Sequence, residues 1–176
     1  GATHIQAYEG NPEHAAFIAR ASAIIGLQDQ LSVYNAYFDF SPPPDTQKSL
    51  DAGLCLNVLH HLGDDFGNPE LNVDEAKHAI NTALQTLASS CQTLWFQIGF
   101  NWKGNRTTPL FKTGGKEELI DFVQASCANH WAIENIGIFN PNTQQYEALN
   151  QALLARFDTA GEFLNRPIFL LKSSKI

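Results

Sequence analysis

A buried-strand pattern in the middle of the chain constrains the fold more than any other feature. The segment Asp51–Gly67 reads DAGLCLNVLHHLGDDFG, an apolar run that turns polar at Asn57 and breaks at Gly63. Strands buried on both faces of a parallel sheet show such runs, with polar groups only where the carboxyl end meets a crevice. Ligands bind at that end of open α/β sheets. The segment therefore predicts a buried parallel strand with a binding site at its end.

Composition narrows the classes of function. The 176 residues are 44% hydrophobic and 16% charged, which predicts one folded domain over residues 1–176. A net charge of −7 disfavours a nucleic-acid partner. No apolar run approaches the ~18 residues of a membrane span. Cys55, Cys91 and Cys127 are odd in number and widely spaced, which indicates reduced thiols in a cytoplasmic protein without a zinc site.

Strands and helices are expected to alternate along the chain. Strands are predicted at Thr3–Tyr8, Leu31–Phe38, Leu50–Leu59, Gln92–Phe100, Trp131–Phe139 and Pro167–Lys172. Helices are predicted from Pro12 (with Asn11 as N-cap) to Gly26, and at Asp74–Ser89, Lys116–Asn129 and Thr143–Phe157. Ser41–Lys48 and Asn101–Gly115 are predicted loops. This order predicts a mainly parallel sheet covered on both faces.

The segment Asp51–Gly67 resembles the fourth-strand motif of class I S-adenosylmethionine (SAM) methyltransferases, many of which read D-x-x-x-x-x-x-V-L-H-H-L. The element order also resembles that family from its second strand to its seventh, with Pro167–Lys172 as the antiparallel final strand. The resemblance implies a Rossmann-like fold, a mainly parallel three-layer α/β/α sheet with an antiparallel C-terminal strand.

The family's first strand and its Gly-rich turn have no counterpart here. The chain contains no G-x-G-x-x-G, and Gly114–Gly115 follows no strand. It also begins at Gly1 and has no methionine, so we expect a fragment, a processed form or a truncated domain. Without that strand, Thr3–Tyr8 and Leu50–Leu59 lose a common neighbour and its ladder hydrogen bonds. The sheet would close up, another segment would fill the slot, or the edges would pair with another chain, as in a homodimer.

Glu9 is the first candidate for a cofactor contact. A carboxylate at a strand end can accept hydrogen bonds from both ribose hydroxyls, and the sequence E-G-N-P resembles methyltransferases at this place. The alternative is an acid that only interacts favourably with the helix N-terminus.

Four more cofactor contacts follow from the resemblance. Ala36 and Tyr37 match the region that packs on adenine, although the usual acid is absent from that strand end and Asp39 comes later. The alternative is an aromatic core strand. Leu56 and Asn57 match the region that contacts the SAM amino group. The alternative for Asn57 is a side chain that satisfies nearby backbone groups in a turn.

His60 and His61 are weak catalytic candidates. Either could act as a general base for methyl transfer. Together with Asp64 and Asp65 they could also be metal ligands, but adjacent strand residues point to opposite faces, so we expect no metal site. The remaining alternative is a buried, hydrogen-bonded histidine that shapes the crevice.

Trp102, Lys103 and Arg106 are the candidates for substrate contacts, because binding groups concentrate on loops and this Gly/Pro-containing loop follows a predicted strand. The preceding Trp95 and Phe96 are expected to be core residues. Nothing in the sequence identifies the substrate.

The sequence leaves three alternative hypotheses for the function. The first is a SAM-dependent methyltransferase acting on an unknown acceptor, a small molecule in view of the charge, by in-line displacement that relies on positioning. The second is a non-catalytic methyltransferase-like module, or an inactive fragment, used for association; the absent Gly-rich turn favours it. A nicotinamide dehydrogenase ranks last, because it needs the same glycine turn.

Overall fold

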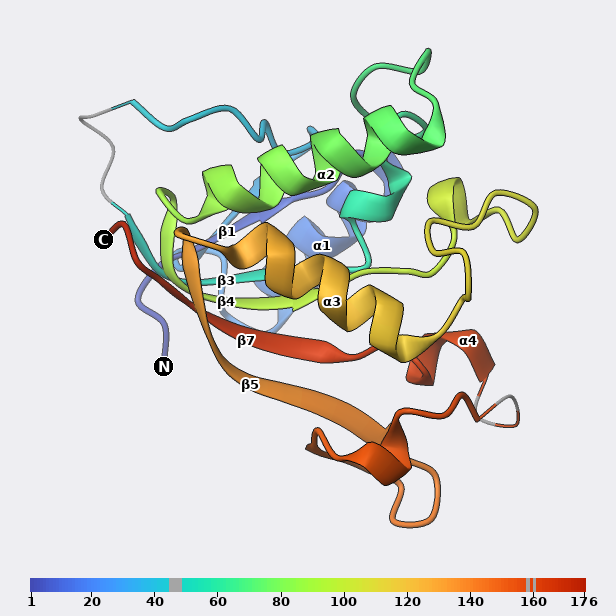
Figure 1. The fold of residues 1–176 in the computed structure, drawn as a ribbon. Coiled ribbons are helices and arrows are strands. Elements are labelled where there is room, and N and C mark those ends of the chain that lie inside the picture. The colour runs from blue at the N-terminus through green and yellow to red at the C-terminus, as the bar shows by residue number, and fades with distance from the viewer. Residues whose placement is uncertain (45–48, 158, 160) are drawn as a thin grey trace. The chain divides into compact units, whose positions relative to one another are not determined.

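The computed structural model describes residues 1–44, 49–157, 159 and 161–176. The last four residues of the predicted loop Ser41–Lys48 lie outside this description. The described chain forms two compact units, Gly1–Asp39 and Phe40–Ile176, and each is treated by itself (Figure 1).

The first unit is a strand–helix–strand crossover. β1 (Ile5–Tyr8) and β2 (Leu31–Tyr34) pair in parallel, and α1 (Pro12–Ile24) connects them. The Asn11 side chain accepts hydrogen bonds from two backbone amides of the first turn, and Pro12 occupies the first helical position, as predicted. The second strand ends at Tyr34, four residues before the predicted end.

The second unit contains a five-stranded sheet in the order β3-β4-β7-β5-β6. Its strands are β3 (Leu50–Leu56), β4 (Cys91–Gln97), β5 (Trp131–Asn140), β6 (Gln145–Ala148) and β7 (Ile168–Ser173). β3 and β4 run parallel, whereas the pairs β4–β7, β7–β5 and β5–β6 are antiparallel. β7 therefore has the antiparallel direction expected of the closing strand.

Helices cover one face of this sheet. α2 (Val73–Leu87) and α3 (Lys116–Cys127) lie beside each other on the same side (Figure 1). Below them, Cys55, Leu94 and Phe96 share the buried side of β3 and β4. On the other side, Leu54 and its register partner Trp95 are 75% and 40% exposed. At β3 and β4, the face beneath the helices is therefore buried at Cys55, Leu94 and Phe96, whereas the other face is exposed at Leu54 and Trp95.

The prediction of one Rossmann-like, mainly parallel three-layer sheet is wrong. The described strands form two separate sheets, and only one pair of the larger sheet is parallel. β1 and β3 belong to different sheets. They are the two strands that were expected to lose a common neighbour, the first strand of the family. Because β3 is an edge strand with one exposed face, its apolar run did not indicate burial on both sides.

The helix predicted at Thr143–Phe157 is also wrong. β6 pairs antiparallel with β5 through a turn in which Gln144 has a left-handed φ of 57°. The Glu147 carboxylate accepts hydrogen bonds from Asn140 and Thr143 across this turn. Pairing with β5 outweighs the modest helical preference of these residues. A 3-10 turn at Gln151–Leu153 follows.

Candidate functional site

A set of hydrogen-bonded side chains joins the carboxyl ends of β3 and β4; we call Asn57, Gln97, Glu162 and Arg166 the polar network. Asn57 follows β3 directly and has a left-handed φ of 61°, which asparagine tolerates. Its Nδ2 donates to Gln97 Oε1 at 2.7 Å, and its Oδ1 accepts from Arg166 Nη1 at 2.6 Å. Gln97 Nε2 donates to the Arg166 carbonyl at 2.9 Å. Both polar atoms of the Asn57 side chain therefore already have protein partners.

Arg166 and Glu162 supply the charges of this network. Glu162 lies in the short helix α4 (Gly161–Leu164) and Arg166 lies just before β7. Arg166 Nη2 donates to Glu162 Oε1 at 3.0 Å, and Asn101 Nδ2 donates to the same oxygen at 3.2 Å. Arg166 is buried, and its Nε has no hydrogen-bond partner among the described residues. This pair of a buried arginine and a partly buried carboxylate is a candidate binding site at the strand ends, although such pairs also occur for structural reasons.

His60 lies next to this network but is not placed to transfer protons near neutral pH. It is 2% exposed, and its Nδ1 accepts a hydrogen bond from the Gly99 amide at 3.3 Å. Burial, followed by the charges of His61 and Arg166, lowers the pKa of His60 to about 3. A general base works best with a pKa near the operating pH. The geometry favours the alternative of a buried, hydrogen-bonded histidine that shapes the end of β3.

His61 lies close to two carboxylates. The two histidines belong to the 3-10 turn η1 (Leu59–His61) rather than to β3, which ends at Leu56. His61 Nδ1 lies 3.8 Å from Asp64 Oδ2 and 3.5 Å from Asp65 Oδ2. We expected no metal site because adjacent strand residues point to opposite faces. His60 and His61 are not in a strand, so that reason does not apply to them.

The three predicted substrate residues occupy different environments. Trp102 is buried in the 3-10 turn η2 (Trp102–Gly104), and its Nε1 donates to the Leu62 carbonyl at 2.7 Å. Lys103 Nζ lies 4.4 Å from the centroid of the Trp102 ring. Arg106 is 86% exposed at its side chain, and its Nε lies 3.8 Å from Glu162 Oε2. Trp102 therefore anchors the loop, and Arg106 lies at the exposed edge of the polar network.

The five predicted cofactor residues divide between the two units. Leu56 and Asn57 belong to the second, and the other three lie near the carboxyl end of the β1–β2 pair. Glu9 Oε1 accepts a hydrogen bond from the Asn11 amide at 2.8 Å. The Tyr37 ring lies so close to Gly10 that a Cβ there would be 2.2 Å from it. Ala36 is exposed.

Sequence reasoning missed three members of the polar network. Gln97, Glu162 and Arg166 were not singled out, although each had a signal. Gln97 is a polar residue at the end of an otherwise apolar strand, and Glu162 and Arg166 are four residues apart just before the last strand. That spacing brings side chains together on a helical turn.

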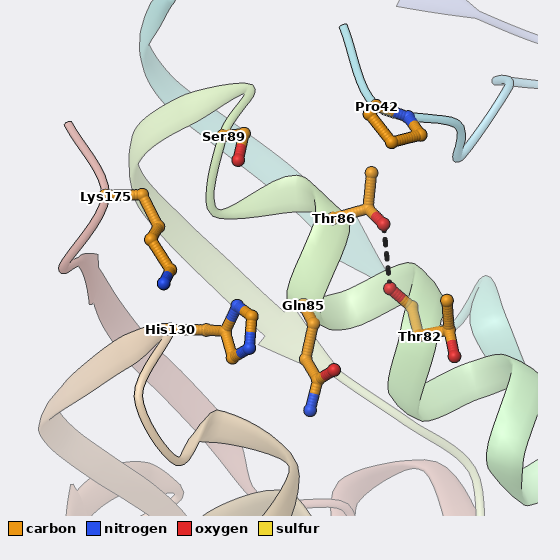
Figure 2. A pocket seen from close by; sticks show the side chains of 7 residues that line it. All are labelled: Pro42, Thr82, Gln85, Thr86, Ser89, His130 and Lys175. Carbon is orange, nitrogen blue, oxygen red and sulfur yellow. Dashed lines mark hydrogen bonds between the residues drawn. The ribbon is translucent and has the colours of Figure 1, made fainter.

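The shallow depression drawn in Figure 2 lies at the opposite end of the parallel strands. His130 and Lys175 reach toward it from the start of β5 and the end of β7, and the C-terminal part of α2 forms its wall (Figure 2). Its remaining lining residues are Pro42, Thr82, Gln85, Thr86 and Ser89. None of the predicted site residues lines it, so it plays no part in the site described above.

The comparisons with known proteins leave the family open. No protein-family model, curated protein or solved structure matches this chain. None of the helices in the described part of the chain is long and apolar enough to cross a membrane; α2, with 15 residues, has the greatest length among them.

Proposed function

We propose that this chain is a SAM-dependent methyltransferase that acts on a small, unidentified acceptor in the cytoplasm. The observation that carries the proposal is the end of β3, where the motif-like segment leaves a parallel strand and turns polar. The three free, buried cysteines support a reducing compartment. The charge of −7 supports an acceptor other than nucleic acid.

The resemblance assigns each cofactor contact to a residue. Glu9 would hold the ribose hydroxyls, and Ala36 and Tyr37 would contact the adenine. Because Gln97 and Arg166 already use the Asn57 amide, the amino group of SAM would be held by the main chain at Leu56 and Asn57. When bound, SAM would supply a methyl group activated by its sulfonium. Lys103 and Arg106 would position the acceptor for in-line attack, which depends mainly on alignment.

Calorimetric titration of S-adenosylhomocysteine into the purified chain tests this proposal. We expect micromolar binding that Glu9→Ala abolishes and Glu13→Ala leaves unchanged. Glu13 is the matched control because it is an exposed acid in the first turn of α1 but does not follow a strand directly. No binding at millimolar ligand, or equal binding by both variants, would refute the cofactor assignment.

The second candidate function is a non-catalytic module that associates with a second copy of the chain. Among the described strands, β3 is at the edge of the larger sheet, and an unpaired edge is a template for another strand. Leu54 exposes an apolar side chain on this strand. A two-fold symmetric dimer would pair the two copies of β3 antiparallel, since the same surface is used twice.

Sedimentation velocity distinguishes this second function from the first. We expect a dimer that Leu54→Asp dissociates while Ile24→Asp does not. Ile24 is the matched control because it is equally apolar and 85% exposed but lies on α1. A monomer at every accessible concentration would refute association through β3.

A further inference from the structure

Three potential metal ligands converge in the turn that follows β3. His61, Asp64 and Asp65 each offer one ligand atom, and these atoms lie within 4.8 Å of one another. The imidazole Nδ1 lies 3.8 Å from Asp64 Oδ2 and 3.5 Å from Asp65 Oδ2. Two ligands of one ion with bonds of about 2.1 Å lie about 3.0–3.4 Å apart. Small side-chain rotations would therefore bring all three atoms to bonding distance from one ion.

The Nδ1 atom of His61 has no hydrogen-bond partner among the residues that the structure describes. This atom is also shielded from solvent. Both carboxylates are too distant for a good hydrogen bond. A buried polar atom without a partner costs free energy and is rare in native proteins, and a bound ion is one of its ordinary explanations. This orphaned nitrogen, together with the two carboxylates it faces, points to a cation.

Main-chain hydrogen bonds fix the backbone of the turn that carries the three side chains. The amides of Asp64 and Asp65 both donate to the His61 carbonyl, at 2.9 Å and 3.2 Å. Gly63 donates to the Phe66 carbonyl at 2.6 Å and has a positive φ of 89°. The ligands thus come from one short, internally bonded turn, so little ordering is needed before an ion binds.

We propose that His61, Asp64 and Asp65 bind a divalent first-row transition-metal ion, with Mn²⁺ as the clearest probe. One imidazole nitrogen with two carboxylate oxygens suits such ions better than Mg²⁺ or Ca²⁺, which prefer oxygen ligands alone. The carboxylates are 47% and 54% exposed, so water or a ligand can complete the coordination. The nearby Lys103 directs its ammonium over the Trp102 ring. This inference does not rest on SAM binding.

A simple ion pair is the competing explanation. A protonated His61 would be attracted to both carboxylates without any metal. Addition of Mn²⁺ distinguishes the two explanations, because only a metal site would bind the ion at a fixed stoichiometry per chain.

The experiment is a titration of Mn²⁺ into the purified, chelator-treated chain, followed by calorimetry and by the electron paramagnetic resonance signal of free Mn²⁺. Mn²⁺ is preferred to Zn²⁺ because thiols bind zinc well, and this chain has three cysteines. The test variant combines Asp64→Asn and Asp65→Asn, which keep the side-chain shape. The control combines Asp74→Asn and His78→Asn. These two exposed residues of α2 are four positions apart, as His61 and Asp65 are.

We expect one Mn²⁺ per chain with micromolar affinity, weakened at least ten-fold in the test variant and unchanged in the control. Mg²⁺ is expected to compete poorly. Absence of Mn²⁺ binding at millimolar concentration would overturn the proposal and leave the ion pair. Equal affinity in the test variant and the wild type would overturn it as well, since the ion would then be held elsewhere. Circular dichroism of each variant without metal checks that the fold is kept.

Discussion

Replacement of His60 tests whether a buried neutral histidine governs the acid sensitivity of the second unit. We choose His60→Asn because the Asn Oδ1 atom can take the place of Nδ1 and accept the hydrogen bond from the Gly99 amide. The variant removes the titrating group while it keeps the acceptor.

The sign and size follow from the two pKa values. The pKa of His60 is about 3 in the folded chain, because of burial first, and about 6.5 in the unfolded chain. Between these values the unfolded chain binds more protons, so the free energy of unfolding falls as the pH falls. From about pH 7.5 to about pH 5 the loss amounts to about 2 kcal/mol, and it continues until the pH reaches the folded pKa.

Urea denaturation at these two pH values measures the effect. We expect the wild type to lose about 2 kcal/mol more than His60→Asn, because carboxylates titrate equally in both proteins. His78→Asn, an exposed histidine on α2, is the control and should behave as the wild type does. An identical loss in the wild type and in His60→Asn would refute the reasoning, since His60 would then titrate with similar ease in the folded and unfolded chains.

Two further substitutions test the surroundings of the site by the free energy of unfolding. Gly99→Ala should destabilise the fold by about 1–3 kcal/mol, because the new Cβ would lie 2.7 Å from the His60 ring. Gly137→Ala is the control and should change the stability little, because the atom nearest to its Cβ would be 3.7 Å away. Equal effects of the two substitutions would contradict a clash with His60. Arg166→Met should cost about 2–4 kcal/mol by removing the buried charge partner of the partly buried Glu162 carboxylate. Arg106→Met, which removes an exposed arginine from the same carboxylate, should cost under about 1 kcal/mol. A larger loss in Arg106→Met than in Arg166→Met would contradict the view that the buried arginine stabilises this network.

Local sequence signals predicted the elements well where the chain itself determines them. The N-cap and proline at the start of α1, and the strands β4, β5 and β7, agree with the expected positions to within a few residues. These features depend on capping and on short apolar runs, which are visible in the sequence.

The environment of each apolar run was not predictable in the same way. Leu54 has the hydrophobicity of a buried strand residue, yet it is 75% exposed because no described element of its own unit covers that face. Hydrophobicity states what a side chain prefers, whereas exposure depends on which other segments reach it. The division into two sheets was missed for the same reason.

The candidate site was predictable in part. The sequence located the end of β3 and the residues Asn57, His60 and His61. It could not show that Arg166, more than a hundred positions later, bonds to Asn57. Nor could it show that β3 ends three residues early and that both histidines lie in a 3-10 turn.

The position of β7 has a consequence for the synthesis of the protein. β7 comes last among the strands in sequence but lies between β4 and β5 in the sheet. On the ribosome, β4 and β5 therefore emerge without the strand that joins them, and their facing edges stay open until Ile168–Ser173 has left the exit tunnel. Closure of the sheet must therefore wait until Ile168–Ser173 has been translated, and until then the open edges of the nascent chain can pair with other chains.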